Sequence, residues 1–137
     1  MTSAKQLVEL IRDGKVASRA LVEQSLARIE ASDADIEAWA FIDPDGARAR
    51  ADEMDAIRAS GRPLGALHGV PIGLKDIIDT KTMPTECGTV LMAGRQPDAD
   101  AALVERLLDA GAVIIGKTVT TEFAFMYPSK THNPHNL

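Results

Sequence analysis

One lysine at the end of a short apolar segment is the residue best suited to chemistry. Residues 67–76 read L-H-G-V-P-I-G-L-K-D, in which Val70, Ile72 and Leu74 alternate with Pro71, Gly73 and Lys75. Alternation at every second position predicts a strand with one apolar face and with an ammonium at the end of its other face. Enclosure of Lys75 by apolar side chains would disfavour its charged form and make it a candidate base. The neighbours expected to enclose it are Ile72, Leu74, Ile77 and Ile78.

For catalysis, the environment of this lysine would have to lower its pKa strongly. An ordinary lysine, with a pKa near ~10.4, is neutral only about 0.04% of the time at pH 7. General-base work calls for a pKa of roughly 7–8. In the simpler alternative, Lys75 reaches water and pairs with Asp76 or Asp79. Alternation alone does not decide between the two.

The residue sequence of this segment resembles that of a known protein family. L-H-G-V-P-I-G-L-K-D-I-I-D-T, followed by M-P-T-E-C-G-T, closely resembles the lysine-bearing segment of the amidase signature family of serine amidohydrolases. The stretch from Asp98 to Phe125 resembles that family's next helix, strand and helix start, and T-H-N-P-H-N at 131–136 resembles the loop that follows. Together these segments cover about half of the chain.

The resemblance implies a Ser–Ser–Lys triad with Lys75 as its lysine. The family's bridging serine lies in a Gly/Ser-rich loop that would begin shortly after Asn136, and its nucleophile lies further on, whereas this sequence ends at Leu137. We expect the serines present to be no substitute, since the first five fall in helices or caps; they are at positions 3, 18, 25, 32, 60 and 129. The chain alone is therefore expected to be inactive.

The same resemblance suggests a substrate pocket. It implies that the region formed by Phe125, Met126 and Tyr127 lines the acyl pocket, although such residues, with Phe123, more often belong to a core. No cofactor and no metal are expected.

Three functions are open to the sequence. The leading hypothesis is an amidase that hydrolyses a carbon–nitrogen bond of a small amide through an acyl-enzyme, completed by a missing carboxyl-terminal part of the same chain. The same family also contains the A subunit of a glutamyl/aspartyl-tRNA amidotransferase. The third hypothesis, of a different class, is a non-catalytic interaction module or truncated fragment, whose helices pack on the rest of the protein or on a second copy in a homodimer. The sequence identifies neither the substrate nor the oligomeric state.

Composition excludes several other classes. The net charge is −5, and Lys and Arg are interspersed with Asp and Glu, so we expect no direct binding of nucleic acid. No apolar run is long enough to span a bilayer, and the amino terminus lacks an export signal. The single cysteine, Cys87, cannot form an internal disulfide. We therefore expect a cytoplasmic protein with no membrane partner.

A nucleotide-binding pattern also occurs. Residues 111–118 read G-A-V-I-I-G-K-T, a literal match to G-x-x-x-x-G-K-[ST]. We interpret it as an accident, because the residues between the two glycines have the composition of a buried strand. On this interpretation Gly111 ends a helix, Gly116 forms a turn at the strand end, and Lys117 is solvated or lies at a pocket edge.

Two further arrangements rank lower. His132 and His135, spaced H-N-P-H, lack the third and fourth ligands that zinc requires. Cys87 with His68 upstream could form a nucleophile and base, but nothing in the sequence brings them together. We expect Cys87 to be a partly buried, inert thiol.

The elements that would position Lys75 predict an α/β fold. We expect amino-terminal helices plus the opening strands of a mixed sheet covered by helices, a partial amidase-signature fold. Residues 1–137 would form the amino-terminal part of a single amidase domain, with a helical segment at 1–62 and the start of the α/β core at 63–137. Helices are expected from Ser3 to Gly14, from a cap at Ser18 to a turn at 32–35, from Asp43 to Gly61 and around 103–108; strands are expected at 39–42, 70–75 and 113–115.

Overall fold

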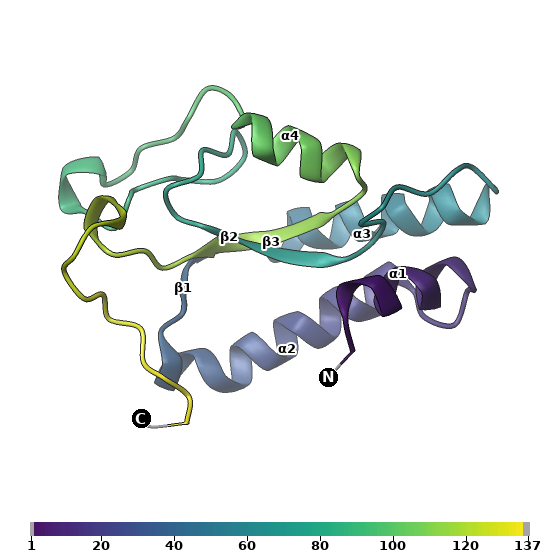
Figure 1. The fold of residues 1–137 in the computed structure, drawn as a ribbon, viewed down its shortest axis with the longest axis horizontal. Coiled ribbons are helices and arrows are strands. Elements are labelled where there is room, and N and C mark those ends of the chain that lie inside the picture. Colours follow the sequence, from purple (N-terminus) through teal and green to yellow (C-terminus); the bar gives the residue numbers. More distant parts are fainter. Residues whose placement is uncertain (1, 136–137) are drawn as a thin grey trace.

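The computed structural model describes residues 2–135. Four helices and three strands follow one another as α1 (Ala4–Arg12), α2 (Ser18–Ile36), β1 (Trp39–Ile42), α3 (Pro44–Ala59), β2 (Pro71–Lys75), α4 (Ala102–Asp109) and β3 (Val113–Thr118). Two short 3₁₀ turns, η1 (Val90–Met92) and η2 (Glu122–Ala124), lie in the loops. In Figure 1, α1 and α2 lie on one side of the sheet and α4 on the other.

The strands form one mixed sheet in the order β1-β3-β2. β2 runs parallel to β3, as expected for strands joined through a helix, and β1 pairs antiparallel with β3. The predicted α/β class with a mixed sheet is therefore confirmed. The order of elements also agrees, since β1 precedes α3 and two helices come before the first strand.

Two of the three predicted helix N-caps are present in the structure, and one is not. The Ser3 capping box is present, with Ser3 and Gln6 bonded reciprocally, and Asp43 caps α3. Ser18 does not cap α2; Ala17 does, and the carboxylate of Asp55 on α3 accepts the free amides of Ser18 and Arg19. The predicted turn at 32–35 is also wrong, since α2 continues to Ile36.

The core lies between the sheet and the helix pair α2 and α3. Aliphatic side chains from all three elements are buried there, namely Val22, Ala47, Ala51, Met54, Val113 and Ile115. Trp39 and Ile42 of β1 pack against its edge. These residues match the apolar stripes of the sequence, which is why the element types could be predicted.

A β-bulge changes the face of the sheet on which the side chains at the end of β3 lie. Ile72 pairs with Ile114, but the next residue, Gly73, pairs with Gly116, so Ile115 is the extra residue. Because paired residues share a face, Lys117 faces the same side as its partner Leu74 and not the side of Val113 and Ile115. Lys75 pairs with Thr118 on the opposite face.

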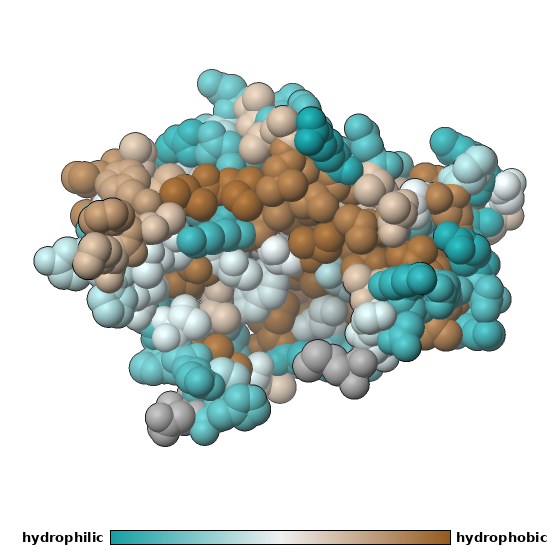
Figure 2. All heavy atoms as spheres, viewed as in Figure 1, coloured by the Kyte–Doolittle hydropathy of each residue, from teal (hydrophilic) through white to brown (hydrophobic). Residues whose placement is uncertain are grey.

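The surface carries two apolar regions. Figure 2 shows apolar surface across the sheet below α4 and at the end of the molecule where η1 and η2 lie. Exposed residues at that end are Val90, Leu91, Phe123, Phe125, Met126 and Tyr127. Within residues 2–135, no helix is long and apolar enough to cross a membrane.

Candidate active site

Lys75 is the last residue of β2. Its carbonyl oxygen accepts hydrogen bonds from the amides of Ile77 and Ile78, at 2.8 and 3.0 Å, so the chain turns sharply directly after it. The amide of Asp76 continues the ladder by donating to the Thr118 carbonyl at 2.8 Å. The backbone around the lysine is therefore fixed on both sides.

The expected enclosure of Lys75 is not seen in residues 2–135. Its side chain is exposed, whereas Leu74 is buried on the opposite face of the sheet. Ile77, after the turn, is itself exposed. The alternation of β2 was predicted correctly, but alternation does not say what covers each face.

The simpler alternative, an ion pair of Lys75 with a neighbouring carboxylate, is not formed either. Asp76 lies 3.2 Å from the ammonium of Lys117, and Asp79 lies 2.6 Å from the guanidinium of Arg95. Among the ion pairs of the described chain, none involves Lys75.

Lys117 is the residue that the sequence pattern misplaces. It is fully buried, not solvated, and its ammonium donates to the Thr85 hydroxyl at 2.6 Å and the Pro84 carbonyl at 3.1 Å, beside the Asp76 carboxylate. Burial lowers its pKa, and the nearby Asp76 carboxylate partly opposes that shift. Two hydrogen bonds and one ion pair therefore surround the buried ammonium.

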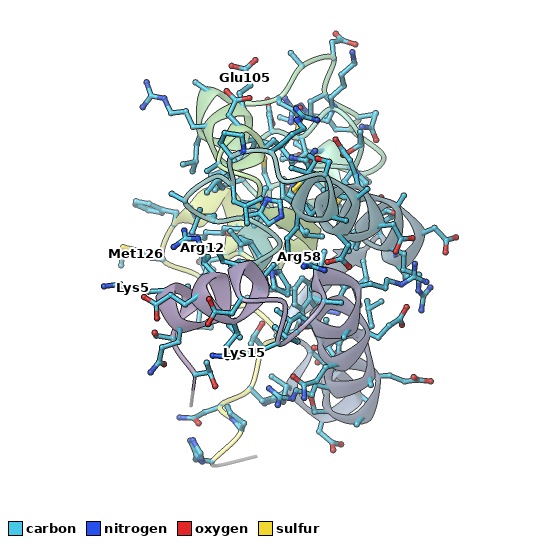
Figure 3. All side chains as sticks on the ribbon, turned by 90° about the vertical axis from the view of Figure 1, so that its right-hand side faces the viewer. Lys5, Arg12, Lys15, Arg58, Glu105 and Met126 are labelled. Carbon is cyan, nitrogen blue, oxygen red and sulfur yellow. The ribbon has the colours of Figure 1, made fainter. Side chains whose placement is uncertain are left out.

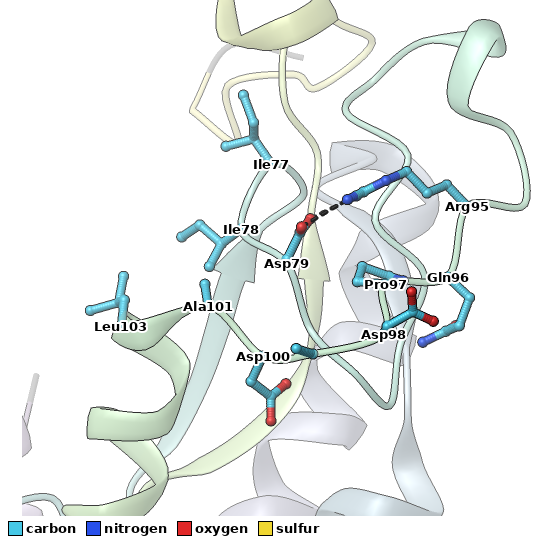
Figure 4. Close-up of a pocket in the computed structure, with 11 residues that line it drawn as sticks. Ile77, Ile78, Asp79, Arg95, Gln96, Pro97, Asp98, Asp100, Ala101 and Leu103 are labelled. Atoms are coloured by element: carbon cyan, nitrogen blue, oxygen red, sulfur yellow. Dashed lines mark hydrogen bonds and ion pairs between the residues drawn. The ribbon is translucent and has the colours of Figure 1, made fainter.

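Arg95 and Asp79 form the second charged pair near Lys75. Two nitrogens of the guanidinium donate to the two oxygens of Asp79, at 2.6 and 2.8 Å, and Arg95 holds the pKa of that carboxyl below its usual value. Figure 4 shows this pair in an open pocket of about 640 Å³. Ile77, Ile78 and Leu103 lie on one side of the pocket, and Lys75 is not among its lining residues.

The predicted pocket residues do not form a core. Phe125, Met126 and Tyr127 are 72%, 80% and 78% exposed, because they follow η2 on a loop that no described helix covers. Figure 3 shows Met126 at the edge of the molecule. Tyr127 lines a second open pocket of about 630 Å³, together with Asp76 and Glu86. Their assignment to an acyl pocket stays a prediction.

The competing motifs have structural explanations. Residues 113–118 of the nucleotide-binding pattern form β3, so their backbone is engaged in the sheet and does not form a phosphate loop. Gly116 lies inside this strand and not at a turn. A side chain at this position would collide with the Phe41 carbonyl. Gly111 ends α4 as expected, with φ of 85°.

Cys87 and His68 do not form a pair. His68 is buried against α3, where its Nε2 lies 3.0 Å from the Met54 carbonyl, and burial lowers its pKa. Cys87 is partly buried and has a positive φ of 55°; its backbone bonds to Asp76 and Phe123. No cluster of three or more metal-ligating side chains occurs in residues 2–135, where His132 and His135 are both exposed.

The first five serines lie in helices or at their caps, as expected. Ser3 is the cap of α1, Ser18, Ser25 and Ser32 lie in α2, and Ser60 is the C-cap of α3. The hydroxyls of Ser25, Ser32 and Ser60 bond to carbonyls of their own helices. The Gly/Ser-rich loop expected after Asn136 lies outside the described residues.

Sequence relatives are amidases and amidotransferase subunits. The chain is 39% identical to the A subunit of glutamyl-tRNA(Gln) amidotransferase from Salinispora arenicola, over 98% of the chain and 29% of that protein. It is 43% identical to the putative amidase AmiD of Mycobacterium bovis, over 88% of the chain and 26% of that protein. The chain thus spans less than a third of the length of these relatives.

Solved structures share the fold. Native peptide amidase from Stenotrophomonas maltophilia superimposes with a TM-score of 0.85 at 38% identity, over 95% of this chain and 27% of its own. A chain of a vestigial protein complex, linked to the origins of an s-triazine catabolic enzyme, gives a TM-score of 0.90 at 35% identity, over 96% of this chain and 30% of its own. Residues 20–137 match the family described as Amidase. With this match and these relatives, the chain belongs to the amidase signature family.

Proposed function

We propose that this chain supplies the lysine of a Ser–Ser–Lys amidase whose complete form hydrolyses the carbon–nitrogen bond of a small amide. The observation that carries the proposal is the position of Lys75, at the carboxyl end of a strand parallel to its neighbour. Ligands of open α/β sheets bind beyond this edge. Membership of the amidase family supports the same assignment.

The chemistry assigned to Lys75 is proton transfer. In the complete enzyme, a serine hydroxyl attacks the amide carbonyl carbon while its proton passes through the second serine to the neutral amine of Lys75. The carbon–nitrogen bond then breaks, and the proton returns to the leaving nitrogen. Water hydrolyses the resulting acyl-enzyme. The exposure of Lys75 in the described residues leaves its ammonium accessible to the parts of the domain that would carry the serines.

The 137-residue chain is proposed to be inactive alone. Five of its six serines lie in α1, α2 or α3 or at their caps. The sixth, Ser129, is partly buried on the segment after η2. Incubation of the purified chain with small amides should release no ammonia. Hydrolysis that disappears in Lys75→Ala would contradict this.

The positive test begins with the intact mass of the natural product in its source cells. A product longer than 137 residues is screened against small amides, with Lys75→Ala as the control. We expect Lys75→Ala to lower kcat by about 10²–10⁴-fold, the usual contribution of a general base. Unchanged hydrolysis in that variant would remove Lys75 from the mechanism.

A second candidate is the A subunit of a tRNA-dependent amidotransferase, which the 39% identity to the Salinispora protein over nearly the whole chain favours. In that function the released ammonia is used by a partner subunit. Ammonia release from glutamine that depends on a partner subunit supports this candidate. Hydrolysis of many simple amides without a partner supports the general amidase.

A third candidate is a non-catalytic interaction module. The exposed apolar residues at η1 and η2 favour it, since contiguous apolar surface marks interfaces. A discrete dimer in solution, with protected amides between Leu7 and Ile29, would support it. Aggregation or a molten state would indicate an incomplete piece of the larger amidase domain.

A further inference from the structure

The segment that follows Lys75 has little regular structure of its own. Residues 76–101 connect β2 to α4, and η1 is the only helix or strand among these described residues. Outside a ladder, backbone groups that are removed from water need partners from neighbouring elements. The position of this segment therefore depends on the side chains that bind it.

Lys117 of β3 binds the middle of this segment. Its ammonium donates to the Thr85 hydroxyl at 2.6 Å and to the Pro84 carbonyl at 3.1 Å, and it lies 3.2 Å from the Asp76 carboxylate. Lys117 and Thr85 are both fully buried, so this bond is made away from solvent. The bulge at Ile115 places Lys117 on this face of the sheet. One side chain of β3 thereby joins the end of β2 to a segment outside the sheet.

Asp76 binds the next two residues of the segment. Its carboxylate accepts the Glu86 amide at 3.2 Å, and its carbonyl oxygen accepts the Cys87 amide at 3.0 Å. The Asp76 amide donates to the Thr118 carbonyl at 2.8 Å. Every polar group of the residue directly after Lys75 therefore has a partner, and together Lys117 and Asp76 bind four consecutive residues, 84–87.

The backbone of Cys87 shows how firmly this segment is fixed. Its φ of 55° lies in the left-handed region, which is unfavourable for a residue other than glycine. Such a conformation persists only where surrounding contacts determine it. Here the Cys87 amide is bound by Asp76, and the Cys87 carbonyl accepts the Phe123 amide at 2.9 Å.

The same segment forms a wall of the second open pocket. Asp76 and Glu86 line this pocket, and residues 88–90 continue the wall. Tyr127, which the family resemblance assigns to the acyl pocket, is among the other lining residues. The buried ion pair therefore connects this wall to the end of β2.

We propose that Lys117 is a positioning residue that acts through Asp76 to hold the end of β2, which carries Lys75, in a fixed relation to residues 84–90. The inference rests on the proposed function, in which Lys75 is the base. Proton transfer requires the two atoms to lie within hydrogen-bond reach, and a displacement of about 1 Å can slow an enzyme strongly. Without its cation, the buried Asp76 carboxylate would have to move toward water, and it is one peptide bond from Lys75.

The first test weakens this connection without removing a charge. Thr85→Val replaces the hydroxyl that accepts from Lys117 by a methyl group of similar size. We expect amide hydrogen exchange of the 137-residue chain to show about tenfold lower protection at Glu86 and Cys87, because opening the segment no longer breaks a hydrogen bond to a buried charge. Lys117→Met should lower both protection factors further, and Thr85→Val decides the matter even if Lys117→Met does not fold.

Thr80→Val is the matched control for the loss of a buried hydroxyl. Thr80 lies in the same segment, is also buried and donates to the Met83 carbonyl at 3.0 Å, but its hydroxyl does not bond to Lys117. This variant should leave the protection of the Glu86 and Cys87 amides unchanged.

The second test is kinetic and uses a natural product longer than 137 residues. Thr85→Val should lower kcat for a small amide by about 10–100-fold with a smaller change in KM, because the base is displaced while the substrate still binds. Thr80→Val should leave kcat unchanged. Circular dichroism at the assay temperature establishes that each variant is folded.

Four results would overturn the proposal. Undiminished protection in Thr85→Val, or equal losses in Thr85→Val and Thr80→Val, would show that Lys117 does not hold the segment. An unchanged kcat in Thr85→Val, or a rise in KM alone, would show that it does not position the base. If the unsubstituted longer product hydrolyses no amide, the proposed function fails and the catalytic role of Lys117 fails with it, while hydrogen exchange still decides whether Lys117 holds the segment.

Discussion

The Lys117 ammonium lies 3.2 Å from the Asp76 carboxylate, with both side chains almost fully removed from solvent. Removing one partner of such a pair leaves the other charge buried and uncompensated. We expect Lys117→Met to lower the free energy of unfolding by about 3–5 kcal/mol, measured by urea denaturation. Asp76→Asn/Lys117→Met should recover much of that loss. A loss below about 1 kcal/mol in the single variant would show that the pair is not buried in solution.

Substitution of Lys75, unlike that of Lys117, should hardly change the free energy of unfolding. It is exposed and forms no ion pair in the described residues, so Lys75→Ala should change the free energy of unfolding by no more than about 0.5 kcal/mol. Equal urea denaturation midpoints for the unsubstituted chain and Lys75→Ala would agree with this expectation. A large loss would mean that Lys75 stabilises the fold, and the kinetics of its variants would then need a correction for stability.

The contrast between Lys117 and Lys75 shows which features of the structure can be predicted from the sequence. Alternation in β2 and the caps at Ser3 and Asp43 are local signals, so the strand, the helices and the mixed α/β class followed from them. The burial of Lys117 depends on one extra residue, Ile115, in the pairing of β3 with β2. No local pattern marks that bulge, and regular alternation places Lys117 on the wrong face. The exposure of Lys75 could not be predicted either, since it depends on which segments cover the sheet.

The cap of α2 is a second tertiary effect. Asp55 lies on α3, yet its carboxylate accepts the amides of Ser18 and Arg19 at 2.8 and 3.0 Å. Asp55→Ala should cost about 1–2 kcal/mol, as for the loss of a good N-cap. Asp52→Ala is the matched control on the same helix, because Asp52 makes only an exposed pair with Arg19, which should contribute less than about 1 kcal/mol. Equal losses in the two variants would argue against the cap.

Gly116 should tolerate no side chain. A Cβ there would lie 2.2 Å from the Phe41 carbonyl oxygen, within the pairing of β1 with β3. We expect Gly116→Ala to cost more than about 2 kcal/mol, or to detach β1, which amide hydrogen exchange at Trp39 to Ile42 would detect. Gly61→Ala is the control, since nothing lies within 4 Å of its Cβ and only its positive φ of 73° adds strain, worth about 1 kcal/mol.

Burial of His68 should make stability depend on pH. Its pKa in the folded chain lies below the ordinary value of 6.5, because burial disfavours the imidazolium. The unfolded chain therefore binds more protons as the pH falls from 6.5 to the lowered value, and the free energy of unfolding decreases over that window. Above pH 6.5 the contribution of His68 is complete and constant. His68→Gln keeps a donor for the Met54 carbonyl but has no ionisable group, so its unfolding free energy should lack this decrease. Urea titrations of both chains between pH 5 and 7 compare the two slopes, and identical slopes would assign the decrease to other groups.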